Sequence, residues 1–285
     1  MRNVFTIILI GSMVFQIFGC RAASKFTLAP VKTFDPDNAN IPQPKEREEN
    51  QIWDIARLTF LYQIEKLLDL NWTLRKAGKI THVAKGRQAD NVNVLDEVPN
   101  SSWYTNRHFH QRMSVEALAC GPDETEGPDQ SGPWTIWKDK SEGGTPGFWI
   151  RDAKGDAYIL KFDAPHFNEM GSSAEVISAK IFYACGYNVP QNTIVYFDPE
   201  ILQVGKKVTV VDKGFRRPMA KKDLEKLLKN QPRRKDGQIR AMASKFVKGT
   251  PVGVWNYRGT RGDDPNDRVA HEHRRELRGL RIISA

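Results

Sequence analysis

The chain has 285 residues, of which 40% are hydrophobic and 27% are charged. This composition excludes a disordered protein, and the length suffices for one large domain or two lobes. The formal net charge is +9, but Lys and Arg alternate with acids and leucines in each basic cluster. Such clusters are typical of solvated helix faces, and no nucleic-acid-binding motif accompanies them. We therefore expect no nucleic-acid partner.

The N-terminus has a short basic start, Met1–Asn3, followed by the apolar run "VFTIILIGSMVFQIFG". This run is short for a membrane span and predicts a signal peptide over residues 1–19. The end of the run, "IFGC", resembles the lipobox of bacterial lipoproteins, with Gly19 before Cys20. The resemblance implies that Cys20 is acylated, that membrane lipid is a partner, and that the protein lies on the periplasmic or extracellular face of the cell envelope. An uncleaved anchor and a signal peptide cut elsewhere remain alternatives.

Residues 20–50 are rich in Pro, Asn and charge, and predict a lipidated tether. Residues 51–130 predict a helical and loop-rich extension. Its apolar residues recur at a helical period, so we expect an amphipathic helix that begins after Asn50 and stops at Gly78. That helix would pack on the protein or lie on the membrane. The polar connector "CGPDETEGPDQSGPW" predicts an exposed loop leading into the first strand.

Strand patterns begin near residue 131. The runs "PWTIWKDK", "GFWIRD" and "AYILKFD" predict three strands, and "AKGD" between the last two predicts a hairpin turn with Gly155 at positive φ. The run "SSAEVISAKIFYACG" predicts a helix capped by Ser172 or Ser173 and closed by Gly186. Strands follow in "NVPQNTIVYF" and "QIRAMASKF". Residues 131–254 therefore predict an α+β fold, with a twisted antiparallel sheet and one helix.

Lys161 stands among the apolar residues of "AYILKFD". A buried ammonium group is costly unless an anion meets it, and Glu175 on the following helix is a candidate partner. Alternatively, Lys161 points into water and Glu175 is an ordinary surface residue. Upstream, "KSEGGTPGF" could form a glycine-rich turn whose backbone N–H groups surround phosphates.

The order of these motifs resembles the N-lobe of HipA-type kinases, bacterial serine/threonine kinases with a lobe design shared by protein kinases. The resemblance implies a nucleotide-binding site with ATP and Mg²⁺ as cofactors. In it, Lys161 is the nucleotide lysine, Glu175 is its ion-pair partner, and the hinge beside the adenine is Lys245–Lys248. The loop that covers the phosphates would be formed by Ser141, Gly143, Gly144, Thr145 and Gly147.

Three longer stretches, "NVNVLDEVPNSSWYTNR", "KSEGGTPGFWIRDAKGDAYILKFD" and "GTRGDDPNDRVAHEHRRELRGLR", resemble a group of uncharacterised exported bacterial proteins. In that group the chain continues into a segment with clustered Asn, His and Asp. Residues 255–285 would then be the start of a helical C-lobe whose catalytic segment is missing. The resemblance implies at most a kinase-like phosphotransferase, inactive as given and with no catalytic residues of its own. A non-enzymatic binding or structural lipoprotein of the envelope is the alternative.

Two further motifs bear on metal binding. In "DDPND", the acids Asp263, Asp264 and Asp267 precede a predicted helix, and we expect an Asx turn and an N-cap rather than a metal loop. The motifs "HFH" and "HEH" lack the paired Cys or distant His of a zinc site. We therefore expect no metal centre.

Overall fold

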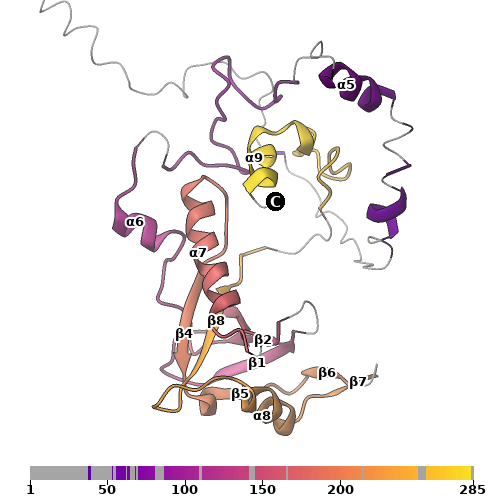
Figure 1. The fold of residues 1–285 in the computed structure, drawn as a ribbon. Helices are drawn as coiled ribbons and strands as arrows, with labels where there is room; N and C mark the ends of the chain where they lie inside the picture. The colour runs from indigo at the N-terminus through magenta and orange to yellow at the C-terminus, as the bar shows by residue number, and fades with distance from the viewer. Residues whose placement is uncertain are drawn as a thin grey trace, which may run out of the picture. The chain divides into compact units, whose positions relative to one another are not determined.

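The computed structural model describes residues 38–39, 53, 56–61, 63–64, 68, 70–80, 87–108, 111–140, 145–164, 166–212, 215–249 and 255–283. They belong to two compact units (Figure 1). One unit is Thr105–Thr250, and the other combines Met1–Tyr104 with Pro251–Ala285. The predicted signal peptide, Cys20 and most of the predicted tether lie outside the described residues.

The Thr105–Thr250 unit contains a six-stranded sheet in the order β4-β8-β3-β2-β1-β5. The strands are β1 (Trp134–Asp139), β2 (Gly147–Arg151), β3 (Ala157–Lys161), β4 (Asn192–Phe197), β5 (Leu202–Val204) and β8 (Ile239–Lys245). The α+β class is confirmed. The sheet is mixed, however, because β5 pairs parallel to β1, so the purely antiparallel expectation was wrong. Three residues are too few for β5 to show a periodic pattern in the sequence.

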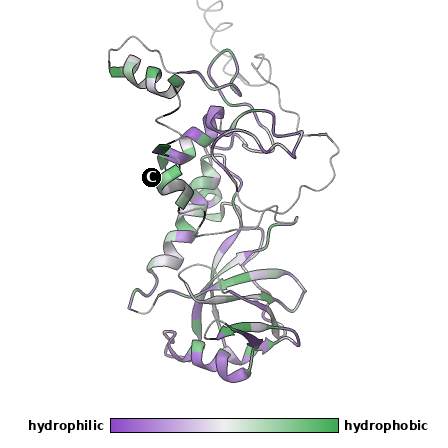
Figure 2. Ribbon diagram, turned by 90° about the vertical axis from the view of Figure 1, so that its right-hand side faces the viewer, coloured by the Kyte–Doolittle hydropathy of each residue, from purple (hydrophilic) through white to green (hydrophobic). Residues whose placement is uncertain are grey.

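One face of the sheet forms the hydrophobic core. Residues paired across antiparallel strands share a face, so Phe148, Leu160 and Ala243 lie together there. Helix α8 (Lys221–Lys229) contributes Leu224 and Leu228 to the same core. Figure 2 shows hydrophobic and hydrophilic residues interspersed along the strands. Successive side chains of a strand point to opposite faces, so burial of this face explains why large apolar residues occupy every second position at Tyr158, Leu160 and Phe162.

Helix α7 (Met170–Ala184) packs on β4 and β8. The prediction that Ser172 or Ser173 caps it was wrong, because the helix begins at Met170 and its N-cap is Glu169. The Asp163 carboxylate instead accepts hydrogen bonds from the backbone N–H of Glu169 (3.0 Å) and of Ser172 (2.7 Å). The distant aspartate thus satisfies N–H groups that a local cap would otherwise satisfy. At the other end, Gly186 has φ of 103°, as predicted for the residue that closes the helix.

A short helix and a small hairpin complete this unit. Helix α6 (Val115–Cys120) is capped by Ser114, whose hydroxyl accepts a hydrogen bond from the Ala117 N–H at 3.1 Å. Strands β6 (Thr209–Asp212) and β7 (Phe215–Pro218) form a separate two-stranded ribbon. Gly155, between β2 and β3, has the predicted positive φ of 88°.

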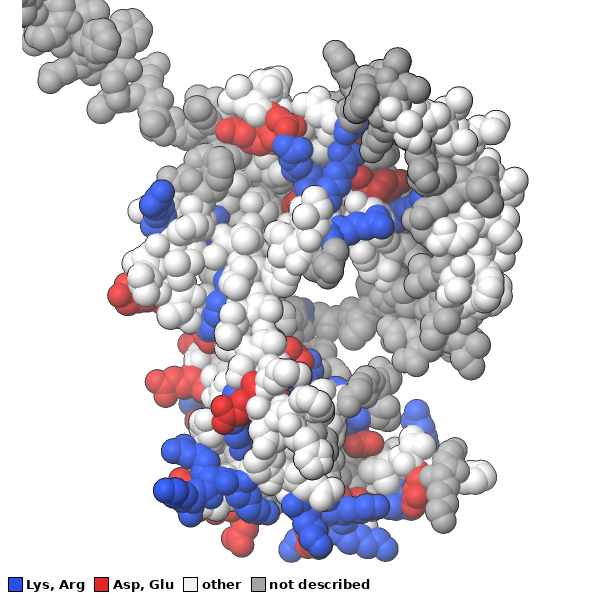
Figure 3. Space-filling model, viewed as in Figure 1, with Lys and Arg blue, Asp and Glu red and all other residues white. Residues whose placement is uncertain are grey.

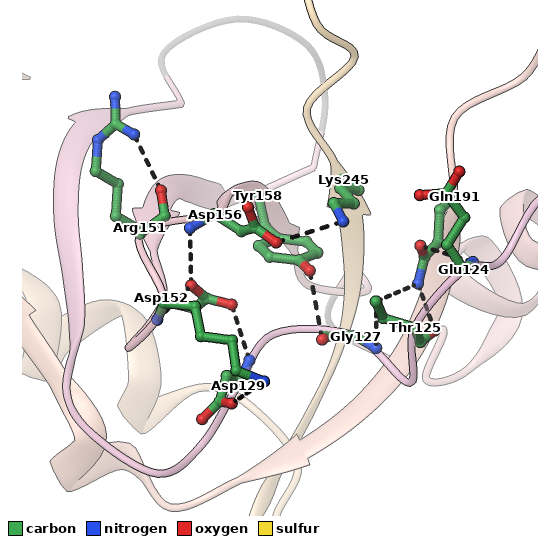
Figure 4. A network of polar contacts seen from close by, with 12 residues as sticks. Glu124, Thr125, Gly127, Asp129, Arg151, Asp152, Asp156, Tyr158, Gln191 and Lys245 are labelled. Atoms are coloured by element: carbon green, nitrogen blue, oxygen red, sulfur yellow. Dashed lines mark hydrogen bonds and ion pairs between the residues drawn. The ribbon is translucent and has the colours of Figure 1, made fainter.

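The polar connector before β1 is fastened to the sheet by hydrogen bonds (Figure 4). The Gln191 side chain donates to the Thr125 carbonyl at 2.5 Å, and the Tyr158 hydroxyl donates to the Gly127 carbonyl at 3.3 Å. The Asp129 N–H donates to the Asp152 carboxylate at 2.9 Å. The connector therefore lies along the β2–β3 turn and the start of β4.

The second unit holds helix α5 (Leu70–Ile80), a π-helical turn at Arg57–Leu61, a 3-10 turn at His271–His273 and helix α9 (Arg275–Ile283). Gly78 lies inside α5, so the predicted stop there was wrong, and Asn50 lies outside the described residues. The predicted Asx turn is confirmed, because the Asn266 N–H donates to Asp264 Oδ1 at 2.9 Å. Among the described helices, none combines the length and apolar character needed to cross a bilayer.

Candidate functional site

Lys161 and Glu175 meet over one face of the sheet. Lys161 is the last residue of β3, and it pairs with Met242 of β8 and Gly147 of β2, on the face opposite the core. Its Nζ lies 2.6 Å from Oε2 of Glu175 on α7. The two side chains are 27% and 38% exposed. Of the two readings left open by the sequence, the structure shows the ion pair.

This ion pair does little for folding. Pairs that remain open to solvent contribute about 0–1 kcal/mol, because water screens the charges and the side chains lose entropy. Lys161 carries three N–H donors, and the contact with Glu175 uses one of them. Because its side chain is partly exposed, Lys161 is accessible to an incoming anion. The geometry thus leaves donor capacity at the end of β3.

The end of the predicted phosphate loop lies beside this pair. Gly147 is directly opposite Lys161 in the β2–β3 register, and a Cβ built on Gly147 would lie 2.1 Å from the Leu160 carbonyl oxygen. Thr145 accepts hydrogen bonds from Lys140 Nζ through its carbonyl (2.7 Å) and its hydroxyl (3.3 Å). The other three loop residues lie outside the described part of the chain: Ser141, Gly143 and Gly144.

A buried polar network fixes the first turn of α7, which precedes Glu175. Arg240 of β8 donates to Asp163 at 3.0 Å and to the Ser173 hydroxyl at 2.9 Å, and it also contacts the Ser172 hydroxyl. Arg240 and Asp163 are nearly buried, at 11% and 8% side-chain exposure. Burial acts to raise the pKa of Asp163, but the hydrogen bonds from Ser172 and from the Glu169 amide outweigh it and hold this pKa below its usual value. The network therefore positions the helix that carries Glu175.

The predicted hinge residues follow at the end of β8. Lys245 Nζ lies 3.4 Å from the Asp156 carboxylate (Figure 4). Burial acts to lower the pKa of Lys245, but the neighbouring Tyr158 and Asp156 outweigh it, so this pKa is raised. Burial also raises the pKa of Tyr158. Beyond β8, Val247 and Lys248 are exposed.

A second polar cluster, in the other unit, was not found by sequence reasoning. It brings residues 91–104 and "DDPNDRVAHEHRRE" together, and its six buried polar side chains are Asn91, Asn93, Asp267, His271, Arg274 and Glu276. The sequence signal was the shared richness of both stretches in Asn, Asp and Trp or His. Without spatial pairing, that composition indicated only turns.

The geometry of this cluster is that of a structural core. Asp267 is buried, and its carboxylate lies 2.7 Å from His271 Nε2. It therefore does not cap a helix, and the predicted N-cap was wrong. Asn91 donates to Glu276 at 2.5 Å, and the Arg274 guanidinium lies 4.4 Å from the Trp103 ring centroid. Buried charges are stable only when partnered in this way.

Within the described residues, no group of three or more His, Cys, Asp or Glu side chains is placed to hold a metal ion. His108 is exposed, and His110 lies outside the described residues. Comparison of the chain with protein-family models, with curated proteins and with solved structures finds no match.

Proposed function

We propose that the Thr105–Thr250 unit is a kinase-like lobe of the HipA type that binds a nucleotide through its phosphates. The observation that carries this proposal is the 2.6 Å ion pair between Lys161, at the end of the third strand, and Glu175, on the helix that follows. Protein kinases hold ATP phosphates with a lysine of the third strand, which a glutamate of the next helix orients. Lys161 would contact phosphate oxygens, and Glu175 would hold its side chain in place.

The connection order supports the same proposal. The predicted phosphate loop joins β1 to β2, and Gly147 at its end is opposite Lys161. Helix α7 joins β3 to β4, and β8 lies between β3 and β4 in the sheet. The segment after β8 would be the hinge beside the base. Bound Mg²⁺ would neutralise phosphate charge, as it does in kinases.

The low stability gain of the pair also supports a binding role. Fixing a long lysine and a glutamate in one geometry has an entropic cost that a half-exposed ion pair scarcely offsets. A pre-oriented ammonium group does, however, lower the ordering cost of binding a phosphate. The Arg240–Asp163 network adds to this pre-orientation because it fixes the start of α7.

Nucleotide titration of the full-length chain tests the proposal. We expect ATP or ADP with Mg²⁺ to raise the unfolding temperature, because a ligand of the folded state stabilises it. Lys161→Ala and Glu175→Gln should weaken nucleotide binding about tenfold or more, the usual loss of a charge-assisted hydrogen bond. Lys154→Ala is the matched control, because it breaks the Lys154–Asp129 ion pair, also 2.6 Å long, elsewhere in the unit. Absence of stabilisation by ATP, ADP and GTP would leave the alternative of a non-enzymatic envelope binding protein.

We also infer that the chain is a lipoprotein anchored through Cys20 in the bacterial cell envelope. The support is the sequence "IFGC" after a short apolar run. One acyl chain binds membranes only marginally, whereas several hold a protein firmly. Mass spectrometry of the mature N-terminal peptide should find an acylated Cys20, and Cys20→Ala should leave the precursor unprocessed. An unmodified Cys20 in the mature chain would contradict this inference.

A further inference from the structure

The end of the Thr105–Thr250 unit that carries α8 and the β6–β7 hairpin is strongly basic. Figure 3 shows Lys and Arg side chains gathering over this end. Between residues 206 and 236, the exposed acids are Asp212, Glu225 and Asp236. The exposed basic residues outnumber them, and they are Lys206, Lys207, Arg216, Lys221, Lys222, Lys226, Lys229, Arg233, Arg234 and Lys235. We call the β6–β7 hairpin together with the outer face of α8 the basic hairpin surface.

Apolar side chains project from the same hairpin. Phe215, the first residue of β7, is 79% exposed, and Val211 of β6 is 52% exposed. Phe215 pairs with Asp212 and Val211 pairs with Arg216, so the two apolar side chains lie on opposite faces of the ribbon, near the connection of its strands. Each face of the ribbon therefore carries one exposed apolar side chain.

The base of this surface is fixed to the core. Val208 and Met219, on either side of the hairpin, are buried in the sheet's core, together with Leu224 of α8. Arg217 of β7 donates to both carboxylate oxygens of Asp223, at 2.7 and 2.8 Å, which ties the hairpin to the first turn of α8. The charged groups and the exposed apolar side chains are thus presented by an anchored scaffold.

We propose that the basic hairpin surface docks on an anionic lipid bilayer. Lys and Arg side chains are attracted to lipid phosphates, and an exposed aromatic beside them gains free energy by entering the acyl boundary. A ribbon that exposes one apolar side chain on each face, Phe215 beside Asp212 and Val211 beside Arg216, suits a fluid interface, which can surround it. This inference is independent of the nucleotide site and of Cys20, because it needs neither Lys161 nor an acyl chain.

Hydrogen exchange on the full-length chain tests the proposal locally. The chain is mixed with vesicles of phosphatidylcholine alone, or of phosphatidylcholine with phosphatidylglycerol. The N-terminal apolar run of the chain can insert into either kind of vesicle. A difference in exchange between the two vesicle compositions therefore reports on the rest of the protein. We expect amides of β6, β7 and α8 to exchange more slowly with the anionic vesicles only, and high salt to abolish the difference. Equal exchange with both vesicles would overturn the proposal.

Variants identify the surface. Lys222→Glu with Lys226→Glu should weaken anionic-vesicle binding about fivefold for each basic side chain lost, or more. Phe215→Ser should reduce the protection of β6 and β7. The matched controls are Arg112→Glu with Arg268→Glu, which change net charge equally at other exposed positions, and Ile177→Ser, which removes an exposed apolar residue of α7. If the controls lose protection as much as the test variants, or if an acidic protein rather than lipid protects the hairpin, the proposal is wrong.

Discussion

Gly147 shows how one backbone contact limits the choice of residue. A Cβ at this position would lie 2.1 Å from the Leu160 carbonyl oxygen, which belongs to the adjacent strand and cannot move alone. The glycine is therefore required by the approach of β2 to β3, whatever the neighbouring loop binds. Gly147 is also paired with Lys161, so a change at this position would affect the neighbourhood of the proposed nucleotide lysine.

We expect Gly147→Ala to lower the free energy of unfolding by about 1–3 kcal/mol, because the methyl group forces β2 away from β3. Denaturant unfolding followed by tryptophan fluorescence measures this loss. Gly262→Ala is the control, since no atom lies within 4 Å of a Cβ built there and its φ is not in the left-handed region. Equal stability of Gly147→Ala and the parent chain would contradict the close approach.

Asp163 links pH to the position of α7. Its pKa is lower in the folded protein than the usual 3.8. The stability that it contributes is therefore complete above that value and is lost as the pH falls through the lower, folded pKa. Asp163→Asn should remove this part of the acid sensitivity. At neutral pH it should cost about 3 kcal/mol, because the nearly buried Arg240 loses its counter-charge.

Urea unfolding of Asp163→Asn and of the parent chain, at neutral pH and near pH 3, measures both effects. Glu126→Gln is the control, because it removes one exposed carboxylate from the same unit. A parent-like urea midpoint for Asp163→Asn at neutral pH would show that Arg240 does not depend on this carboxylate.

At the scale of elements, the connector before β1 depends on one carboxylate of the β2–β3 turn. Asp152 is buried, and it accepts hydrogen bonds from the N–H groups of Asp129 (2.9 Å), Lys154 (3.0 Å) and Asp156 (2.8 Å). Asp152→Ala removes the acceptor of these three N–H groups. Leaving a buried donor without an acceptor lowers the free energy of unfolding by about 1–3 kcal/mol. We expect faster hydrogen exchange of amides in residues 124–131, while α8 stays protected. Uniform exchange across both segments would contradict a local role.

The elements that the sequence predicted well are those with internal patterns. Burial alternates along β3 and the start of β1, β2 is an apolar run with aromatic residues, and Gly155 marks the turn between β2 and β3. The sequence offered Glu175 as a candidate partner of Lys161 and left a solvent-exposed lysine as the alternative, and the resemblance to kinases implied the ion pair that the structure shows. The cap of α7 was not predictable in this way, because Asp163 lies several residues before the helix and Arg240 comes from a distant strand. Local rules describe neighbours, whereas these contacts require the sheet to be formed first.

At the scale of the whole molecule, chain order and spatial grouping differ. Residues 87–104 pack with residues 255–283, although the entire Thr105–Thr250 unit lies between them in the sequence. The contacts include the Asp90 N–H donating to the His273 carbonyl at 2.9 Å and the Arg275 N–H donating to Asn91 at 2.9 Å. The hydrophobic core of the sheet, by contrast, is contained within residues 134–243. Each unit thus has a separate source of stability.

This division predicts that damage to the buried charge cluster stays within its own unit. The Glu276 side chain is fully buried, and Asn91 donates to it while Arg274 lies 3.7 Å away at 1% exposure. Glu276→Ala removes one of the two carboxylates beside the buried Arg274 guanidinium, the other being Asp267 at 3.9 Å, so we expect about 3 kcal/mol of destabilisation. Hydrogen exchange should increase in α9 and in residues 87–104, with no change in β2, β3 or β8, and nucleotide binding should be unchanged. Arg268→Ala, at an exposed position of the same unit, is the control. If Glu276→Ala opened the sheet as readily as α9, the two units would form one cooperative structure and the separation of their cores would have no thermodynamic meaning.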